Sequence, residues 1–314
     1  MNPATDDPSK GTEPMLLDLV DVFGAAPLRG NPLAVVRGED ALMEALSGAR
    51  MQALTDWLGF SETTFLLPPT DPAADYRVRI FCPGRELPFA GHPTLGSCHA
   101  WLAAGGVPRS AGVVVQECGV GLVRVRRDDD RLAFAAPPLI RSGPLDAEAR
   151  AAAIALAGVD PATVLDAVHA ANGPAWVLLR LDSVEALLAA EPAARAPVGS
   201  DVGLVAATGP GDPGAGAVQF ELRAFFADAQ GTMIEDPVTG SLNAATAQVL
   251  FDAGLATGGY VAGQGRKTGA DGRVYCRRAG DGTIWIGGQC ATISSGGTLP
   301  EGLFADAGRP GQQD

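Results

Sequence analysis

Two stretches of the chain share a pattern. Arg79-Ile-Phe81 is followed by His92-Pro-Thr-Leu-Gly-Ser97, and Arg223-Ala-Phe225 is followed by Asp236-Pro-Val-Thr-Gly-Ser241. In both, the first residue of the hexamer lies 13 positions after the arginine. Each hexamer has proline second and glycine-serine at its end, and each leads into an alanine-rich stretch that ends near glycine. Such self-similarity predicts an internal duplication, and so two similar halves.

The regions around these stretches alternate short strand patterns with a few helical ones. Strands are predicted at 20–23, 33–36, 76–81, 113–116, 122–126 and 132–135, and helices at 40–58, 93–104, 145–157, 184–190 and 240–253. The strands outnumber the helices, whereas a doubly wound parallel sheet needs a helix after nearly every strand. An α+β fold with antiparallel or mixed sheets is therefore expected.

The duplication suggests a division of the chain. Residues 15–127 form the predicted first half and 128–304 the second, and the segment 128–143, with its Asp run and paired prolines, is a candidate link. Residues 1–14 and 305–314 are rich in Pro, Gly, Asp or Gln and are predicted to be flexible tails.

Composition restricts the class of protein. The 314 residues are 46% hydrophobic, enough for a full core, and the formal net charge of −13 disfavours binding to nucleic acid or anionic lipid. No apolar run is long enough to span a bilayer, and the N-terminal segment lacks the pattern of a signal peptide. The five scattered cysteines predict neither a disulfide framework nor a zinc site. A soluble cytoplasmic enzyme is the expectation.

The hexamers predict an anion site. Free N–H groups and the positive end of the dipole at a helix start attract a carboxylate, and two such starts related by a pseudo-two-fold axis would share one cleft. His92 and Asp236 then form an unequal titratable pair, which asymmetric acid–base chemistry requires. The alternative is that both residues only cap their helices.

Glu62 is a third candidate. It lies between Phe60 and Phe65, where partial desolvation would raise the pKa of its carboxyl and make it a better base. The alternative is an exposed glutamate at the start of a strand. Weaker candidates are a phosphate loop at 263–268, where Arg266 stands in place of the required glycine, and a Cys98-His99 nucleophile. His169 is expected to be structural, and the histidines and carboxylates lack metal-ligand spacing.

Together, these motifs resemble a known family. Asp21-Val-Phe23, Gly30-Asn-Pro-Leu-Ala-Val35, Ser61-Glu-Thr-Thr-Phe65, Gly91-His-Pro-Thr94 and Glu235-Asp-Pro-Val-Thr-Gly-Ser241 occur in the order typical of the PhzF family of phenazine-biosynthesis-like isomerases. The resemblance implies a diaminopimelate epimerase-like fold, with two halves that each curl a mixed sheet around a central helix.

The resemblance also implies a site. Glu62 corresponds to the family's general acid/base, and His92 and Asp236 to its assisting residues. The backbone of Gly91, Gly240 and Ser241 would hold the substrate, lined by Asn31 and Ser61. The resemblance further implies proton transfer without a cofactor, and a homodimer. Related racemases carry a cysteine at each helix start; here Ala90-Gly91-His92 and Glu235-Asp236-Pro237 carry none, which disfavours two-thiol chemistry.

The hypothesis from the sequence is a cofactor-independent isomerase that shifts a proton, and with it a double bond, on a small carboxylate. Two alternatives remain open: a hydrolase or lyase that uses the same carboxylates, and a non-catalytic small-molecule binding protein. The substrate itself is not specified by the sequence.

Overall fold

The computed structural model describes residues 14–128, 130–212, 217–300 and 303, so the predicted tails lie outside it except for Pro14. The first elements are β1 (Met15–Val22), β2 (Asn31–Arg37), α1 (Asp40–Ala45), α2 (Gly48–Leu58), β3 (Glu62–Leu67), β4 (Tyr76–Cys82), β5 (Arg85–Leu87), α3 (Gly91–Ala103), β6 (Val113–Cys118), β7 (Gly121–Asp128), β8 (Arg131–Ala135) and β9 (Arg141–Pro144). The later elements are α4 (Ala147–Ala157), a 3-10 turn (Pro161–Thr163), β10 (Val164–Ala171), β11 (Val177–Leu181), α5 (Val184–Ala189), β12 (Asp201–Ala207), β13 (Phe220–Ala227), β14 (Met233–Asp236), α6 (Gly240–Asp252), β15 (Gly259–Gln264), β16 (Gly272–Arg278), β17 (Ile284–Gly288) and β18 (Cys290–Leu299). No helix in the described ranges is long and apolar enough to cross a membrane.

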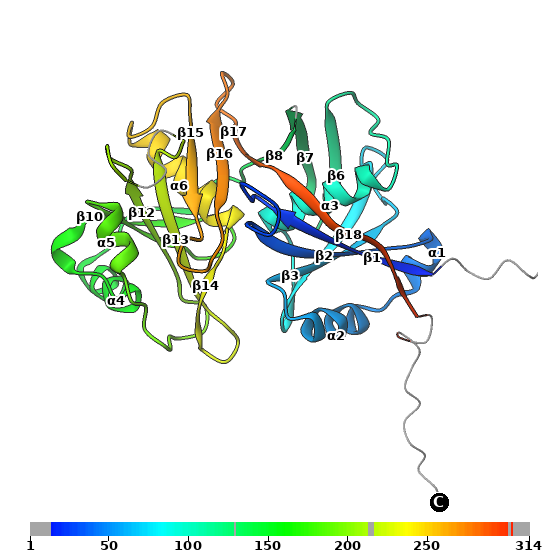
Figure 1. Cartoon of the computed structure of the whole chain (residues 1–314), viewed down its shortest axis with the longest axis horizontal. Helices are drawn as coiled ribbons and strands as arrows, with labels where there is room; N and C mark the ends of the chain where they lie inside the picture. The colour runs from blue at the N-terminus through cyan, green and yellow to red at the C-terminus, as the bar shows by residue number, and fades with distance from the viewer. Residues whose placement is uncertain (1–13, 129, 213–216, 301–302, 304–314) are drawn as a thin grey trace, which may run out of the picture.

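The strands form one continuous hydrogen-bonded sheet with two equivalent parts (Figure 1). Hydrogen bonding runs β18-β1-β2-β3-β4-β6-β7-β8 in one part and β9-β10-β11-β12-β13-β15-β16-β17 in the other, and antiparallel pairing of β8 with β17 joins them. In both parts the third strand pair, β2–β3 or β11–β12, is parallel. The predicted α+β fold with two pseudo-symmetric halves and mixed sheets is confirmed.

In each part, the first strand of the hydrogen-bonded order follows the last strand of the other part along the chain. β9 follows β8 along the chain but pairs with β10, and β18 follows β17 but pairs with β1. The predicted division into residues 15–127 and 128–304 stays a prediction. The strands β8 and β18 lie in the second range but pair with β7 and β1 in the first.

Each half wraps its sheet around one central helix. α3 packs against β1, β2, β3 and β8, and α6 against β10, β16 and β17. Their apolar side chains, with those of the inner sheet faces, form one core cluster that spans both halves. The outer faces are covered separately, by α1 and α2 over β3 and β4, and by α4 and α5 over β11 to β13.

Four predicted helices, 93–104, 145–157, 184–190 and 240–253, match α3, α4, α5 and α6 to within two residues. The single helix predicted at 40–58 is wrong, because α1 and α2 are separate. Between them Leu46 has an extended backbone (φ −74°, ψ 116°), and its side chain is buried in the core cluster beneath the two helices. Ser47 and Gly48, poor helix formers, mark the break.

The sheet register corrects the match between the two hexamers. Ile80 pairs with Leu87 in the first hairpin, and Ala224 pairs with Asp236 in the second. Leu87 lies four residues before the start of α3, and Asp236 lies four residues before the start of α6. The equal 13-residue spacings are therefore a coincidence, because the second hairpin has a longer turn, Asp228–Thr232, and one more residue pair than the first. In space Gly91 corresponds to Gly240, and His92 corresponds to Ser241, not to Asp236.

Candidate active site

The two central helices meet end to end. A Cβ placed on Gly240 would lie 2.9 Å from both the Cα of Gly91 and the backbone nitrogen of His92. A Cβ on Gly91 would lie 3.0 Å from the Cα of Gly240 and 2.7 Å from the ring of Phe134. Only glycine permits this approach. The predicted convergence of two helix N-termini is present, and it brings residues of both halves together.

Glu62 and Asn31 come from the starts of two neighbouring parallel strands. Glu62 is the first residue of β3 and Asn31 the first of β2, so both side chains leave the same end of the sheet. The loop before Asn31 is fixed by Asp21, whose carboxylate accepts hydrogen bonds from the backbone N–H groups of Arg29 and Gly30. Asn31 is fully buried.

Asp236, at the end of β14, is held by groups from both halves. Its Oδ1 accepts hydrogen bonds from Asn31 Nδ2 at 3.0 Å and from Ser61 Oγ at 3.2 Å, and its Oδ2 accepts one from Thr239 Oγ1 at 2.5 Å. Asn31 Nδ2 also donates to the carbonyl of Val238 at 3.0 Å. Four of the predicted site residues are thus close together: Asn31 and Ser61 contact Asp236 directly, and Asp236 acts electrostatically on Glu62.

His92 lies beside Glu62, with its Nδ1 3.3 Å from Glu62 Oε2. The pair is largely buried, since the side chains are 4% and 17% exposed. Neither Glu62 Oε2 nor His92 Nε2 has a hydrogen-bond partner in the described structure. Two such unsatisfied polar atoms in a buried place are costly in a folded chain and are typical of functional sites.

Burial sets the charges of this group. It raises the pKa of the Glu62 carboxyl to about 8, and the Asp236 carboxylate adds to the rise. Burial raises the pKa of Asp236 to about 6, although hydrogen bonds from Thr239, Ser61 and Asn31 oppose this. It lowers the pKa of His92 to about 3, against a hydrogen bond to the Pro32 backbone. Near neutral pH Glu62 is mostly protonated, Asp236 ionised and His92 neutral. Carboxyls with pKa values pushed apart are suited to acid–base roles.

The capping alternative for His92 and Asp236 is wrong. The residues at the cap positions are Ala90 for α3 and Thr239 for α6. His92 is the second residue of its helix, and Asp236 precedes α6 by four positions. The place equivalent to Ala90-Gly91 is Thr239-Gly240, not Glu235-Asp236, and it too lacks a thiol.

Ser241 has a partner that the sequence did not indicate. Its Oγ accepts a hydrogen bond from the indole Nε1 of Trp176 at 3.1 Å, and its carbonyl accepts one from Asn172 Nδ2 at 2.8 Å. Its predicted role in holding a substrate through the backbone stays a prediction.

Glu62 has a counterpart in the second half. Thr63 pairs with Phe81 in the first half, and Val202 pairs with Phe225 in the second, so Glu62 corresponds to Asp201, the first residue of β12. Burial also raises the pKa of Asp201, whose Oδ2 accepts a hydrogen bond from the N–H of Ala175. The sequence repeat does not reveal Asp201, because only the sheet register makes the two carboxylates equivalent.

Thr239 and Gln264 are two further residues of the site. Gln264 lies in the stretch weighed as a phosphate loop, and its Nε2 donates to the carbonyl of Asp236 and to Thr239 Oγ1. Thr239 belongs to the second hexamer, Asp236–Ser241, so its nearness to Asp236 could be predicted from the sequence. The weaker candidates have structural partners: Cys98 is fully buried, and the ring of His99 bonds to Thr292.

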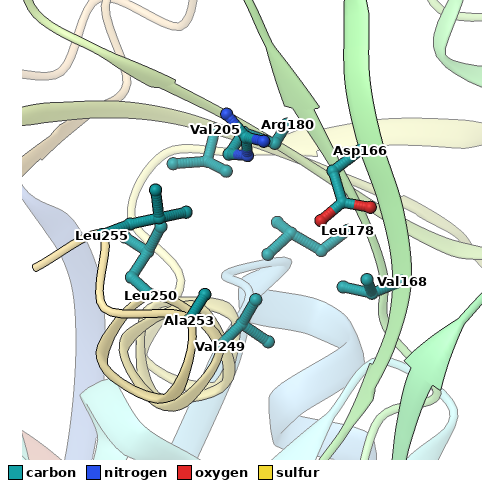
Figure 2. Close-up of a pocket in the computed structure, with 9 residues that line it drawn as sticks. All are labelled: Asp166, Val168, Leu178, Arg180, Val205, Val249, Leu250, Ala253 and Leu255. Atoms are coloured by element: carbon teal, nitrogen blue, oxygen red, sulfur yellow. The ribbon is translucent and has the colours of Figure 1, made fainter.

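Two cavities lie away from this group. The one in Figure 2 is about 20 Å³, room for about one water, between the C-terminal end of α6 and strands β10 to β12. A groove of about 380 Å³ runs over β7, β8 and β15 to β17, where Arg126 and Arg131 stack on Trp285 and Tyr275. Neither cavity is lined by a predicted site residue.

Comparison with known proteins agrees with this fold. Residues 20–296 match the family described as phenazine biosynthesis-like protein. An uncharacterized isomerase of Pasteurella multocida is 27% identical over 90% of this chain and 93% of its own. A trans-2,3-dihydro-3-hydroxyanthranilate isomerase of Pseudomonas aeruginosa is 48% identical, over 26% of this chain and 28% of its own.

Solved structures extend the comparison. A protein of Pseudomonas aeruginosa described as a predicted epimerase has a TM-score of 0.71 and 28% identity, over 92% of this chain and all of its own. A probable proline racemase of Agrobacterium radiobacter, 15% identical, shares the fold with a TM-score of 0.54 over 92% of this chain and 94% of its own. The chain belongs to the phenazine biosynthesis-like family. The first curated relatives are matched over about a third of their length, 36% and 33%.

Proposed function

We propose that this protein is an isomerase that moves a proton, and with it a double bond, on a small carboxylate-bearing metabolite without a redox cofactor. The observation that carries the proposal is the Glu62 carboxyl, buried against His92 and Asp236 where two helix N-termini converge. The isomerase names of the relatives support the same reaction class.

Each group has a distinct role in the proposed reaction. Glu62, in its ionised form, takes a proton from a carbon next to an unsaturated or carboxylate-bearing group and returns it to another carbon. The raised pKa makes its carboxylate a stronger base than an ordinary one. Asp236 stays ionised and accepts a hydrogen bond from the substrate, and the neutral His92 ring polarises the substrate or relays a proton. The helix N-termini attract the substrate carboxylate.

Replacement of the proton carrier tests the proposal. The first compound to try is trans-2,3-dihydro-3-hydroxyanthranilate, the compound named for the Pseudomonas aeruginosa relative, followed by a metabolite extract in deuterated water read by mass spectrometry. We expect the native protein to incorporate solvent deuterium into a product of otherwise unchanged mass, and Glu62→Gln to retain the fold and lose this incorporation. Undiminished incorporation by Glu62→Gln would exclude the assignment.

The same measurement separates the other two classes of protein. A hydrolase or lyase changes the mass of its substrate beyond deuterium exchange. A non-catalytic binding protein retains a bound compound but turns over none, with or without Glu62, His92 and Asp236. Either result would replace the isomerase proposal.

The proposal extends to the setting in which the enzyme works, a homodimer in the cytoplasm, with neither nucleic acid nor membrane as a partner. The family resemblance supports the dimer, and the net charge of −13 supports the exclusion of anionic partners. Light scattering after gel filtration tests the dimer, and a monomeric mass at micromolar concentration would contradict it.

A further inference from the structure

The side chain of Asp236 lies at the end of a chain of hydrogen bonds that starts deep in the second half. Gln264 and Asn243 are both buried, and Asn243 Nδ2 donates to Gln264 Oε1 at 2.9 Å. Gln264 Nε2 donates to Thr239 Oγ1 at 3.0 Å, and Thr239 Oγ1 donates to Asp236 Oδ2 at 2.5 Å.

The direction of this chain is fixed by backbone groups. The N–H of Thr239 can only donate, and it lies 3.1 Å from Gln264 Oε1, so that atom is the amide oxygen. The carbonyl of Asp236 can only accept, and it lies 3.1 Å from Gln264 Nε2, so that atom is the amide nitrogen. The orientation of the Gln264 amide therefore has no alternative that satisfies both groups.

A hydroxyl has one proton to donate. Because Thr239 Oγ1 accepts the hydrogen bond from Gln264, its own proton points at Asp236 Oδ2. Asn31 Nδ2, which donates to Oδ1, can act only as a donor. Both oxygens of Asp236 are thus acceptors, an arrangement that suits a carboxylate and opposes a carboxylic acid.

Glu62 has no comparable support, since its Oε2 lacks a hydrogen-bond partner in the described structure. The two neighbouring carboxyls therefore differ in their donors: the proton is disfavoured on Asp236 and permitted on Glu62. A charge fixed on Asp236 in turn makes Glu62 the stronger base.

We propose that Thr239 and Gln264 are positioning residues that hold Asp236 in its ionised, hydrogen-bond-accepting form, so that the mobile proton of the site belongs to Glu62. The inference deepens the proposed isomerase site and rests on it for its catalytic meaning. The charge distribution itself can be measured without any substrate.

The test is a ¹³C NMR titration of protein labelled at the aspartate carboxyl carbons, with the Asp236 signal assigned by its loss in Asp236→Asn. Thr239→Val keeps the shape of the side chain and removes the hydroxyl. We expect the midpoint of the Asp236 titration to rise by about one pH unit when one donor is lost. Thr239→Ser, which keeps the hydroxyl, should restore the native midpoint.

Thr246→Val is the matched control. Thr246 is a buried threonine on α6, the helix that Thr239 precedes, and its Oγ1 has no hydrogen-bond partner in the described structure, so its replacement should leave the midpoint unchanged. If Thr239→Val does not fold, Gln264→Met interrupts the chain one step earlier, and a smaller rise is expected.

Two results would overturn the inference: an unchanged Asp236 midpoint in the folded Thr239→Val or Gln264→Met protein, or an equal rise in Thr246→Val. The titration stays valid if the protein proves not to be an isomerase, because it reports the charge of Asp236 alone. Failure of the inference and failure of the proposed function are therefore distinguishable.

Discussion

The two halves place different chemistry on the same scaffold. At the first residue of equivalent strands, the first half has Glu62 and the second has Asp201. At the second residue of the central helices, the first has His92 and the second Ser241. Glu62 and His92 lie against each other, whereas Ser241 bonds to the indole of Trp176. The backbone symmetry therefore does not extend to the side chains.

The difference has a chemical consequence. A site with equal groups on both sides suits a reaction that exchanges mirror-related faces, as racemisation does. A site with one carboxyl of raised pKa, one neutral imidazole and one carboxylate held by hydrogen bonds suits the transfer of a proton from one atom of the substrate to another. In this protein Asp236, the group that crosses from the second half, has its spatial counterpart in the apolar Leu87.

Removing each of the two equivalent carboxylates tests the difference between the halves most directly. We expect Glu62→Gln to lower kcat/KM by about 10³-fold, the range of a lost acid–base group. Asp201→Asn, the matched control, should change kcat/KM by less than about tenfold, because Asp201 is not a part of the Glu62 group. Steady-state kinetics on the identified substrate measures both. Equal losses would show that the halves act symmetrically.

The free energy of unfolding should depend on pH through the buried Glu62 carboxyl. Its pKa rises from 4.5 unfolded to about 8 folded, so the folded state holds more protons between these values and loses stability as pH increases through them. Glu62→Gln removes this loss. We expect its free energy of unfolding to exceed the native value at pH 8 by on the order of 1–4 kcal/mol, and the excess to vanish near pH 4.5. Urea unfolding at several pH values measures it.

An exposed glutamate provides the control for that experiment. Glu148→Gln, on the surface of α4, should give a stability curve parallel to the native one. If Glu62→Gln also ran parallel to the native protein from pH 5 to 8, the buried, proton-holding character of Glu62 would be wrong.

Gly240→Ala tests the contact that joins the halves. The added methyl would lie 2.9 Å from the backbone of Gly91 and His92, so the helix ends must separate. We expect a loss of about 1–3 kcal/mol in unfolding free energy, together with a fall in kcat/KM. Gly280→Ala, at an exposed turn with no atom within 4 Å of the added carbon, should change neither quantity. A native Tm for Gly240→Ala would refute the close contact.

The smallest expected effect concerns the second-half counterpart of His92. Ser241→Ala leaves the Trp176 indole N–H without its acceptor, which should cost about 1–2 kcal/mol of stability. Thermal unfolding measures this loss. Trp176→Phe should destabilise the Ser241→Ala protein less than it destabilises the native protein. Additive losses would show that the two side chains are not coupled.

Much of the fold was predictable because it depends on local pattern. Strand patterns and alanine-rich helices indicated the α+β class, the strands β1, β2, β4, β6, β7 and β8 and the helices α3 to α6. The repeated Gly-Ser hexamers indicated two halves. The exceptions have physical reasons. The break at Leu46 arises because that side chain turns into the core, and the equivalence of His92 with Asp236 failed because the turn Asp228–Thr232 shifts the second hexamer along the chain.

The sequence by itself determined which residue types are available at the site and where each joins a strand or helix: Glu62 at a strand start, His92 at a helix start, and Asp236 before another. Only the tertiary structure decided their partners. The pairing of Glu62 with His92, the donors around Asp236 and the role of Gln264 all depend on segments far apart in the chain. Hydrogen bonding and desolvation depend on distance in space, and residue spacing within a single sequence does not specify that distance.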